Sequence, residues 1–140
     1  MAKVSSTTHL PVPAQSVWTV IGGFNALPDW HPAVAKSEQE EKDGAKLRTL
    51  SLAGGGTIVE RLEAKDDKER TYSYSILSGP LPVVNYQATI CVREADGGGC
   101  TVEWTSDFEA SGAPENDATA VIRGIYETGF KNLQTMFGGG

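Results

Sequence analysis

The chain has 140 residues, the length of one domain (residues 1–140), with 12 Lys or Arg and 18 Asp or Glu and a formal net charge of −6. No cluster of basic residues is present to neutralise a phosphate backbone, so we expect no nucleic-acid partner. No stretch approaches the roughly 20 apolar residues of a membrane span, and the first residues lack the apolar core of a signal peptide, so we expect a cytoplasmic protein without a membrane span.

The first 30 residues predict one strand and two short helices. Residues 3–10 alternate, are rich in β-branched residues and stop at Pro11, which predicts a strand. Pro13 and Ala14 then open a helix, whose apolar stripe ends at Gly22. Residues 24–30 predict one further short helical turn.

Residues 34–110 predict six strands joined as antiparallel hairpins, because five breaks rich in Gly, Asp and Pro interrupt an alternating pattern. Successive side chains of a strand point to opposite faces. Even-numbered positions carry the large apolar groups and odd-numbered positions are mostly polar, so one face of the sheet is expected to be dry. The even-numbered apolar residues are Leu50, Leu52, Ile58, Leu62, Tyr72, Tyr74, Ile76, Val84, Tyr86, Ala88, Ile90, Val92, Val102, Trp104 and Phe108.

The last part of the chain predicts a helix of roughly 20 residues, capped near Asn116 or Asp117, because apolar residues recur at steps of three and four after Pro114. At about 1.5 Å per residue, this helix is long enough to cross the dry face of the sheet. A single helix cannot fill a concave sheet, so we expect a ligand cavity between the two.

Two charged residues share the parity of the buried strand positions. Arg48 aligns with Leu50, and Glu60 aligns with Ile58, so both charges are predicted to point inward. A charge in an apolar interior is costly unless it is paired or functional. The functional interpretation makes Glu60 a general acid or base and Arg48 an anchor for an oxygen anion. The alternative is a structural ion pair at the open end of the sheet.

The cavity hypothesis names further ligand-binding candidates on the same faces. The aromatic members either line a pocket or form ordinary core, and their hydroxyl groups can supply hydrogen bonds. His31 either shuttles protons or ties down its loop through hydrogen bonds. Residues 79–82 form either a lid over the cavity or a rigid turn. The ligand-binding candidates are Trp30, Leu50, Ile58, Leu62, Tyr72, Tyr74, Tyr86, Trp104, Phe108, Ile122 and Tyr126.

We expect neither a cofactor nor a metal. Cys91 and Cys100 have opposite parity and are expected to be free thiols. Only His9 and His31 are available beside them, which makes a poor zinc site. The glycine triplets at 54–56 and 97–99 precede no helix with a lysine and are expected to be hairpin turns.

The predicted order of strand, two short helices, six strands and long helix resembles the helix-grip fold of the START-like (SRPBCC) superfamily. The segments Val17–Phe24 and Leu27–Pro32 are similar to its polyketide cyclase/dehydrase branch. Glu60–Glu63, Tyr72–Ile76, Asn85–Ala88 and Gly99–Trp104 resemble strands shared with plant abscisic-acid receptors and the lachrymatory-factor synthase of onion. The resemblance implies an α+β fold, in which a seven-stranded antiparallel curved sheet wraps around the C-terminal helix.

The resemblance also implies site residues. The arginine and glutamate that transfer protons in the onion enzyme correspond to Arg48 and Glu60. Lys36 lies near the lysine that binds the ligand carboxylate in the hormone receptors and is a further ligand-binding candidate. The receptors' gate proline and latch histidine-arginine pair are absent, so a hormone-sensing switch is not expected.

The function expected from the sequence is the binding of a small hydrophobic molecule, with Arg48 and Glu60 orienting its polar group. The alternative is a cofactor-independent cyclase, dehydratase or isomerase that uses the same pair for proton transfer. A third reading is a lipid or quinone carrier that works with another protein. We expect a monomer or a weak homodimer.

Overall fold

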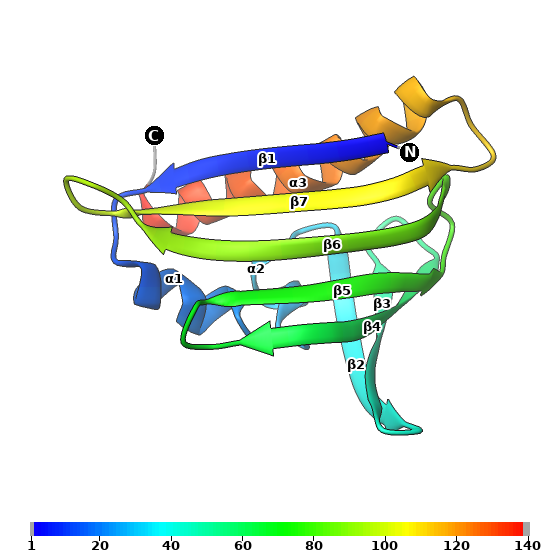
Figure 1. Cartoon of the computed structure of the whole chain (residues 1–140), viewed down its shortest axis with the longest axis horizontal. Helices are drawn as coiled ribbons and strands as arrows, with labels where there is room; N and C mark the ends of the chain where they lie inside the picture. Colours follow the sequence, from blue (N-terminus) through cyan, green and yellow to red (C-terminus); the bar gives the residue numbers. More distant parts are fainter. Residues whose placement is uncertain (1, 139–140) are drawn as a thin grey trace.

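One antiparallel sheet of seven strands carries the fold, in the order β1-β7-β6-β5-β4-β3-β2 (Figure 1). The structure is a computed structural model and describes residues 2–138. Its elements are β1 (Ala2–Leu10), α1 (Ala14–Ile21), α2 (Leu27–Trp30), β2 (Val34–Lys42), β3 (Ala45–Leu52), β4 (Thr57–Asp66), β5 (Thr71–Ser78), β6 (Val83–Glu94), β7 (Cys100–Ala110) and α3 (Glu115–Phe137).

The element order predicted from the sequence is confirmed, with two differences at helix starts. The second short helix begins at Leu27, because residues 23–25 form a bend and turn instead of helix. The cap predicted at Asn116 or Asp117 is wrong: Pro114 occupies the N-cap position and no side chain caps the helix. Proline fits this position because the N-cap residue has an extended backbone and donates no N–H to the helix, and proline has no N–H group.

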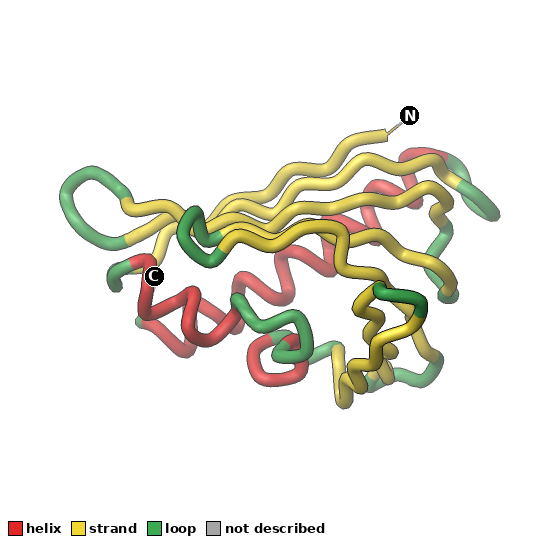
Figure 2. Tube along the Cα trace, turned by 60° about the horizontal axis from the view of Figure 1, so that its bottom comes forward, coloured by secondary structure: helices red, strands yellow, loops and turns green. Residues whose placement is uncertain are grey.

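The long helix α3 lies along the concave face of the sheet and packs against β1 and β7 (Figure 2). Its buried side is apolar and continuous with the inward-facing residues of the strands in one core. At the other end of the sheet β2 and β3 turn away from the direction of β5–β7 (Figure 1). This curvature leaves space between α3 and the inner faces of β3–β6. The buried residues of α3 are Ala118, Ile122, Tyr126, Gly129, Phe130 and Leu133.

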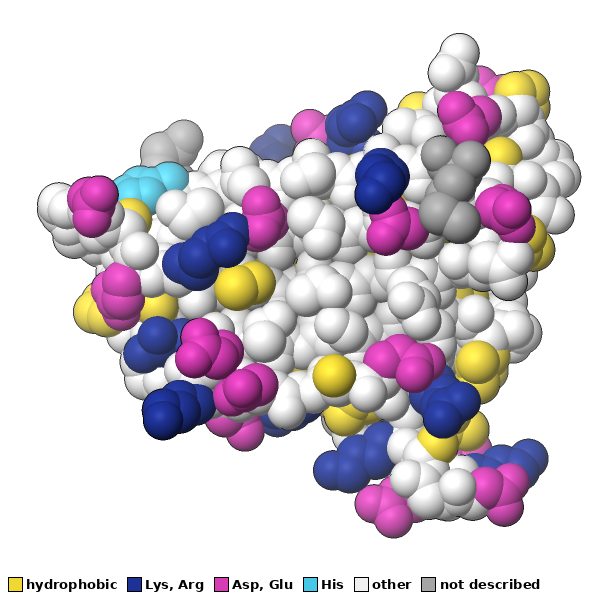
Figure 3. All heavy atoms as spheres, in the orientation of Figure 1, with side chains coloured by type: hydrophobic (Ala, Val, Ile, Leu, Met, Phe, Trp, Pro, Cys, Tyr) yellow, Lys and Arg dark blue, Asp and Glu magenta, His cyan; other side chains and the backbone are white. Residues whose placement is uncertain are grey.

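The convex face of the sheet is the wet face predicted by the alternating pattern. Uncharged polar side chains dominate its centre, and the charged side chains gather mainly around its margins (Figure 3). Cys91 and Cys100 are free thiols. Within residues 2–138, no helix is both long and apolar enough to cross a membrane.

Two strand irregularities break the parity rule. Val84 has the inward parity but is 46% exposed, because the register between β6 and β7 shifts between Val84 and Gln87 and Asn85 adopts a φ of 53°. Lys36 also has the parity of a buried neighbour, Val34, but a register shift separates them and Lys36 faces solvent. A bulge of this kind changes the direction of the side chains beside it.

Candidate functional site

A cavity of about 410 Å³ lies between the concave face of the sheet and α3. Its wall is almost entirely apolar, and its few polar groups come from β4, β5, β6 and the loop after α2. Seven of the side chains proposed from the sequence line it: Leu50, Ile58, Glu60, Tyr74, Tyr86, Trp104 and Ile122.

Arg48 and Glu60 lie directly opposite each other on β3 and β4. The Arg48 Nε atom donates to Glu60 Oε1 over 2.7 Å, and Nη2 lies 2.7 Å from the same oxygen. That distance is typical of a charge-assisted hydrogen bond to a carboxylate. The second oxygen, Oε2, has no hydrogen-bond partner within residues 2–138, and the Glu60 side chain lines the cavity. Glu60 therefore has one oxygen committed to the pair and one left for a guest.

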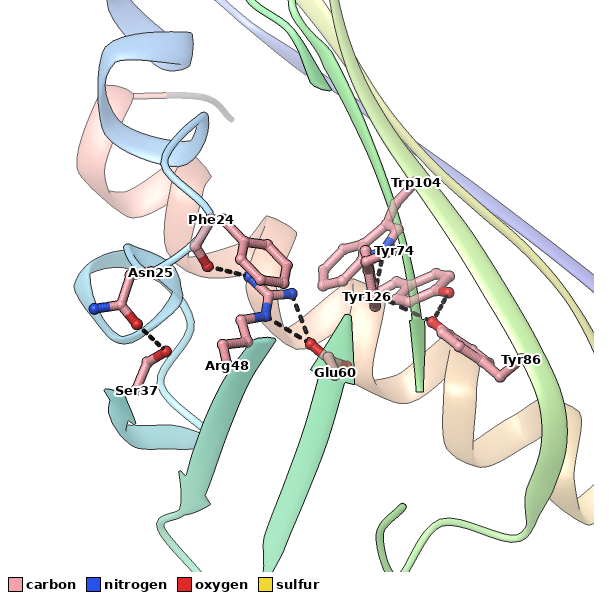
Figure 4. Close-up of polar contacts among 9 residues, drawn as sticks. All are labelled: Phe24, Asn25, Ser37, Arg48, Glu60, Tyr74, Tyr86, Trp104 and Tyr126. Carbon is pink, nitrogen blue, oxygen red and sulfur yellow. Dashed lines mark hydrogen bonds and ion pairs between the residues drawn. The ribbon is translucent and has the colours of Figure 1, made fainter. Parts of the chain in front are cut away.

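The guanidinium of Arg48 is enclosed on the side away from the cavity. Its Nη1 atom donates to the carbonyl oxygen of Phe24 (Figure 4), and the Phe24 ring covers it with a centroid 4.2 Å from Cζ. The Tyr74 ring lies 5.0 Å away. Arg48 is fully buried and does not line the cavity. It can orient Glu60, but in this arrangement it offers a ligand no free surface.

Burial and pairing act in opposite directions on the two charges. Burial raises the pKa of Glu60, and the positive charge of Arg48 limits that rise. Burial by itself lowers the pKa of Arg48, but Glu60 together with Tyr72 and Tyr74 outweighs that effect, and the pKa is raised. Arg48 is therefore a permanent cation, and its contact with Glu60 favours the ionised carboxylate at the cavity wall.

Three tyrosine hydroxyl groups meet beside Glu60 (Figure 4). Tyr86 Oη lies at the centre, bonded to Tyr126 Oη and, over 3.2 Å, to Tyr74 Oη. The indole nitrogen of Trp104 donates to Tyr74 Oη over 3.1 Å. Burial raises the pKa of all three phenols, so they stay protonated at neutral pH. Tyr74 and Tyr86 line the cavity and give it a second polar region.

His31 lies at the cavity wall with both ring nitrogens engaged. The backbone N–H of Ala33 donates to Nδ1 over 3.2 Å, so Nε2 carries the proton and donates to the carbonyl oxygen of Ile125 over 2.7 Å. Burial lowers the pKa of His31, against the smaller effect of that carbonyl. Of the two roles considered from the sequence, this geometry favours the one that ties the loop to α3.

The other sequence candidates lie outside the cavity wall. Lys36 pairs with Glu38 over 2.7 Å on the exposed edge strand β2. Leu62 is half-buried and faces a surface hollow beside Phe24 and Lys65. Four aromatic residues pack behind the wall; for example, the Tyr126 ring stacks on Trp104 with centroids 4.2 Å apart. These four are Trp30, Tyr72, Phe108 and Tyr126.

Sequence reasoning did not assign several lining residues to the cavity. Ile76 and Leu52 have the inward parity, and Val121 and Ile125 belong to the apolar stripe of the long helix, so a signal existed for them. The small residues at the rim gave no periodic signal. The lining residues not proposed from the sequence are Leu27, His31, Ala33, Val34, Leu52, Ala53, Gly54, Gly55, Ile76, Leu81, Val121 and Ile125.

The rim of the cavity brings together the β3–β4 turn and the segment 79–82. A Cβ built on Gly56 would lie 3.7 Å from Pro80 Cγ, and Leu81 contributes to the cavity wall. The carbonyl of Pro82 accepts from the N–H of Ser111 over 3.0 Å, which fixes one end of the segment.

Comparison with known proteins gives consistent matches along the whole chain. The family model described as "Polyketide cyclase / dehydrase and lipid transport" matches residues 1–138. MLP-like protein 423 of Arabidopsis thaliana is 30% identical over 145 residues, covering 93% of this chain and 92% of the relative. The structure of protein XoxI from Bacillus cereus is 40% identical, with a TM-score of 0.91 over 98% of this chain and 96% of that one. A START superfamily protein from Mycobacterium smegmatis shares the fold at 15% identity, with a TM-score of 0.78 over 96% of each chain.

Proposed function

The chain belongs to the polyketide cyclase / dehydrase and lipid transport family, and from this premise we propose that it binds a small hydrophobic molecule between the sheet and α3. The START-like resemblance of the sequence is thereby confirmed. The observation that carries the proposal is the apolar cavity of about 410 Å³, within the size range of ligand sites, with one carboxylate oxygen of Glu60 unpaired at its wall.

In this proposal Glu60 and the phenols orient the polar group of the ligand. Glu60 contributes Oε2, and Tyr74 and Tyr86 contribute hydroxyl groups from the neighbouring strands. Arg48 is a positioning residue, because it holds Oε1 from behind the wall. The apolar remainder of the ligand lies against Leu50, Ile58, Ile122 and Trp104.

The test is a binding assay with an uncharged fluorescent probe, N-phenyl-1-naphthylamine, together with native mass spectrometry of the protein purified from its host. We expect probe fluorescence to rise on binding and to fall when Leu50→Trp fills the cavity. Leu50 is buried at the wall, whereas Leu77 is 53% exposed, so Leu77→Trp is the matched control. Urea unfolding verifies that each variant is folded. If the probe binds Leu50→Trp as tightly as the wild type, the cavity is not the binding site.

A second candidate function is a cofactor-independent isomerase, dehydratase or cyclase. It is favoured by the raised pKa of Glu60 beside an unpaired carboxylate oxygen at the cavity wall. In the simplest step, Glu60 takes a proton from one atom of the bound molecule and returns it to another. An enzyme of this kind loses far more turnover than ligand affinity in Glu60→Gln. A carrier has no turnover. If the wild-type protein converts none of the molecules that it binds, only the binding function remains.

A further inference from the structure

We propose that the cavity selects molecules whose polar group is an uncharged hydrogen-bond donor, an alcohol or a phenol, and that it rejects carboxylates. This inference rests on the proposed function and names the chemical class of its ligand. Three observations carry it: the charge of the wall, the enclosure of Arg48 and the place of Lys36.

The wall of the cavity carries a single formal charge, and that charge is negative. Among its lining residues, all within 2–138, the ionisable side chains are Glu60, His31, Tyr74 and Tyr86. The two phenols are protonated and His31 is held neutral by burial and by its two hydrogen bonds. A guest therefore meets the Glu60 carboxylate and no cation at the wall.

The nearest cation, Arg48, has no free surface for an anionic guest. Its Nε atom donates to Glu60 Oε1 over 2.7 Å, its Nη1 atom donates to the carbonyl of Phe24, and the Phe24 ring covers it. Its Nη2 atom is buried and lies 2.7 Å from Glu60 Oε1 as an ion pair, without a hydrogen bond to any of residues 2–138. The side chain has no exposed surface. Its charge is already balanced by Glu60, so a second carboxylate in the cavity would have no counter-ion.

Lys36, the other cation considered for a carboxylate, lies outside the cavity. Its side chain is 65% exposed on β2 and its ammonium group pairs with Glu38. It cannot neutralise a group that is enclosed between the sheet and α3. Within residues 2–138, no lysine or arginine side chain thus lines the cavity.

The energetic consequence follows from desolvation. An ionised carboxylate that leaves water for an apolar cavity without a cation loses its favourable hydration, and repulsion from Glu60 weakens its binding further. A hydroxyl group loses much less, and it can donate to Oε2 in a charge-assisted hydrogen bond, which is stronger than a bond between neutral groups. Tyr74 and Tyr86 line the same cavity as Glu60 and add two neutral hydroxyl groups to its wall.

The experiment uses three molecules that share one ring system: 2-naphthalenemethanol, 2-naphthoate and 2-methylnaphthalene. Displacement of N-phenyl-1-naphthylamine at pH 7.5 gives the affinity of each. We expect the alcohol to bind at least tenfold more tightly than either of the others. Naphthoate that binds as tightly as the alcohol overturns the inference while the binding function stands. If neither the fluorescent probe nor any of the three binds to the folded protein, the binding function fails as well.

Two variants locate the selectivity at the wall. In Glu60→Gln the charge of Arg48 is no longer balanced, so we expect naphthoate to gain at least tenfold in affinity and the alcohol to weaken. Glu63 lies on the same strand, is exposed and accepts from Ser75 Oγ, so Glu63→Gln is the control and should keep the wild-type order. An unchanged preference in folded Glu60→Gln contradicts the inference.

Proton uptake gives an independent measurement. If only the neutral acid enters the cavity, the apparent affinity for naphthoate rises roughly tenfold for each pH unit lowered, as long as the ligand is mainly ionised. The affinity of the alcohol serves as the reference for changes in the protein itself. If the affinity for naphthoate changes with pH in the same way as the affinity for the alcohol, while naphthoate is mainly ionised, the inference is overturned.

Discussion

Gly129 of α3 lies against the imidazole of His31, so closely that a Cβ at position 129 would come within 2.8 Å of His31 Cδ2. The same Cβ would lie 2.9 Å from Trp30 Cζ3. Both neighbours are rigid rings that are only 1% exposed. The glycine therefore sets how near the helix can approach the loop that carries His31 to the cavity wall.

We predict that Gly129→Ala destabilises the protein although alanine favours a helix. Overpacking against two buried rings costs about 1–3 kcal/mol, more than the gain of about 0.8–1 kcal/mol from helix propensity. Gly124 lies in the same helix, and apart from its chain neighbours and the helix's own nearby backbone, no atom of residues 2–138 comes within 4 Å of a Cβ built there. Gly124→Ala should therefore stabilise the protein. Urea unfolding of both variants measures the difference, and equal effects would contradict the close approach.

We predict that Arg48→Met destabilises the protein by about 3–5 kcal/mol, because it leaves the buried Glu60 without its partner. The double variant Arg48→Met/Glu60→Leu should recover most of that loss, since an apolar pair of similar volume needs no counter-charge. Chemical denaturation of the two variants and the wild type measures the effect.

The single variant Arg48→Met should also depend on pH in a defined direction. Burial raises the pKa of Glu60 in the folded state above the ordinary value near 4.5. A carboxyl group with a raised pKa favours the folded state at low pH, and this stability is lost as pH rises through the folded-state pKa. Arg48→Met should therefore be more stable at pH 5 than at pH 7.5, relative to the double variant. A stability difference that does not change with pH would contradict the prediction.

Because the pKa of the buried His31 is lowered, we predict that the wild type loses stability below neutral pH. Burial lowers its pKa in the folded state, so its contribution is complete above the ordinary value near 6.5 and is lost as pH falls through the folded-state pKa. Protonation would set a second N–H at Nδ1 against the N–H of Ala33 that now donates there. As the pH is lowered from 8 to 5, the free energy of unfolding of His31→Gln should fall less steeply than that of the wild type. The exposed His9 supplies the control for the removal of an imidazole.

The tyrosine cluster predicts an order of stability among single hydroxyl deletions. Tyr86 bonds to two other phenols, whereas Tyr126 bonds to Tyr86 alone among the three. Loss of a buried partner costs about 1–3 kcal/mol, so Tyr86→Phe should destabilise more than Tyr126→Phe. A double-mutant cycle should give a coupling between the two positions. Additive effects would show that the two hydroxyl groups do not stabilise each other.

The inward direction of Arg48 and Glu60 could be predicted because strand parity needs only the residues and the breaks between hairpins. Their exact opposition across β3 and β4 agrees with that parity. Strand parity does not, however, show whether an inward-facing side chain lies at the cavity wall or behind it. The bend before α2 brings the carbonyl and ring of Phe24 over the guanidinium, and this contact joins residues 24 apart. The sequence therefore placed Arg48 inside the protein but could not show that it lies behind the cavity wall.

Lys36 and Leu62, two of the proposed site residues, lie outside the cavity wall where the backbone departs from a regular ladder. The register shift between Val34 and Lys36 sends the lysine to solvent, and the shift after Leu62 accompanies a side chain that is only half-buried. Bulges depend on how two strands pair, so the composition of one strand does not reveal them. The rim residues Gly54 and Gly55 were predicted as a turn, and only the curvature of the sheet brings that turn to the cavity.

Gly54 lies at this rim with a backbone that needs no left-handed conformation. Apart from Gly54 itself and its two chain neighbours, no atom of residues 2–138 lies within 4 Å of a Cβ built there. The cavity rim therefore has free space for a side chain at position 54. Substitution of Gly54 by alanine, leucine or tryptophan should narrow the cavity entrance in steps. The polar groups of the wall, Glu60, Tyr74 and Tyr86, are left unchanged. Under the proposed binding function, such substitutions should change the rate of ligand exchange more than the affinity.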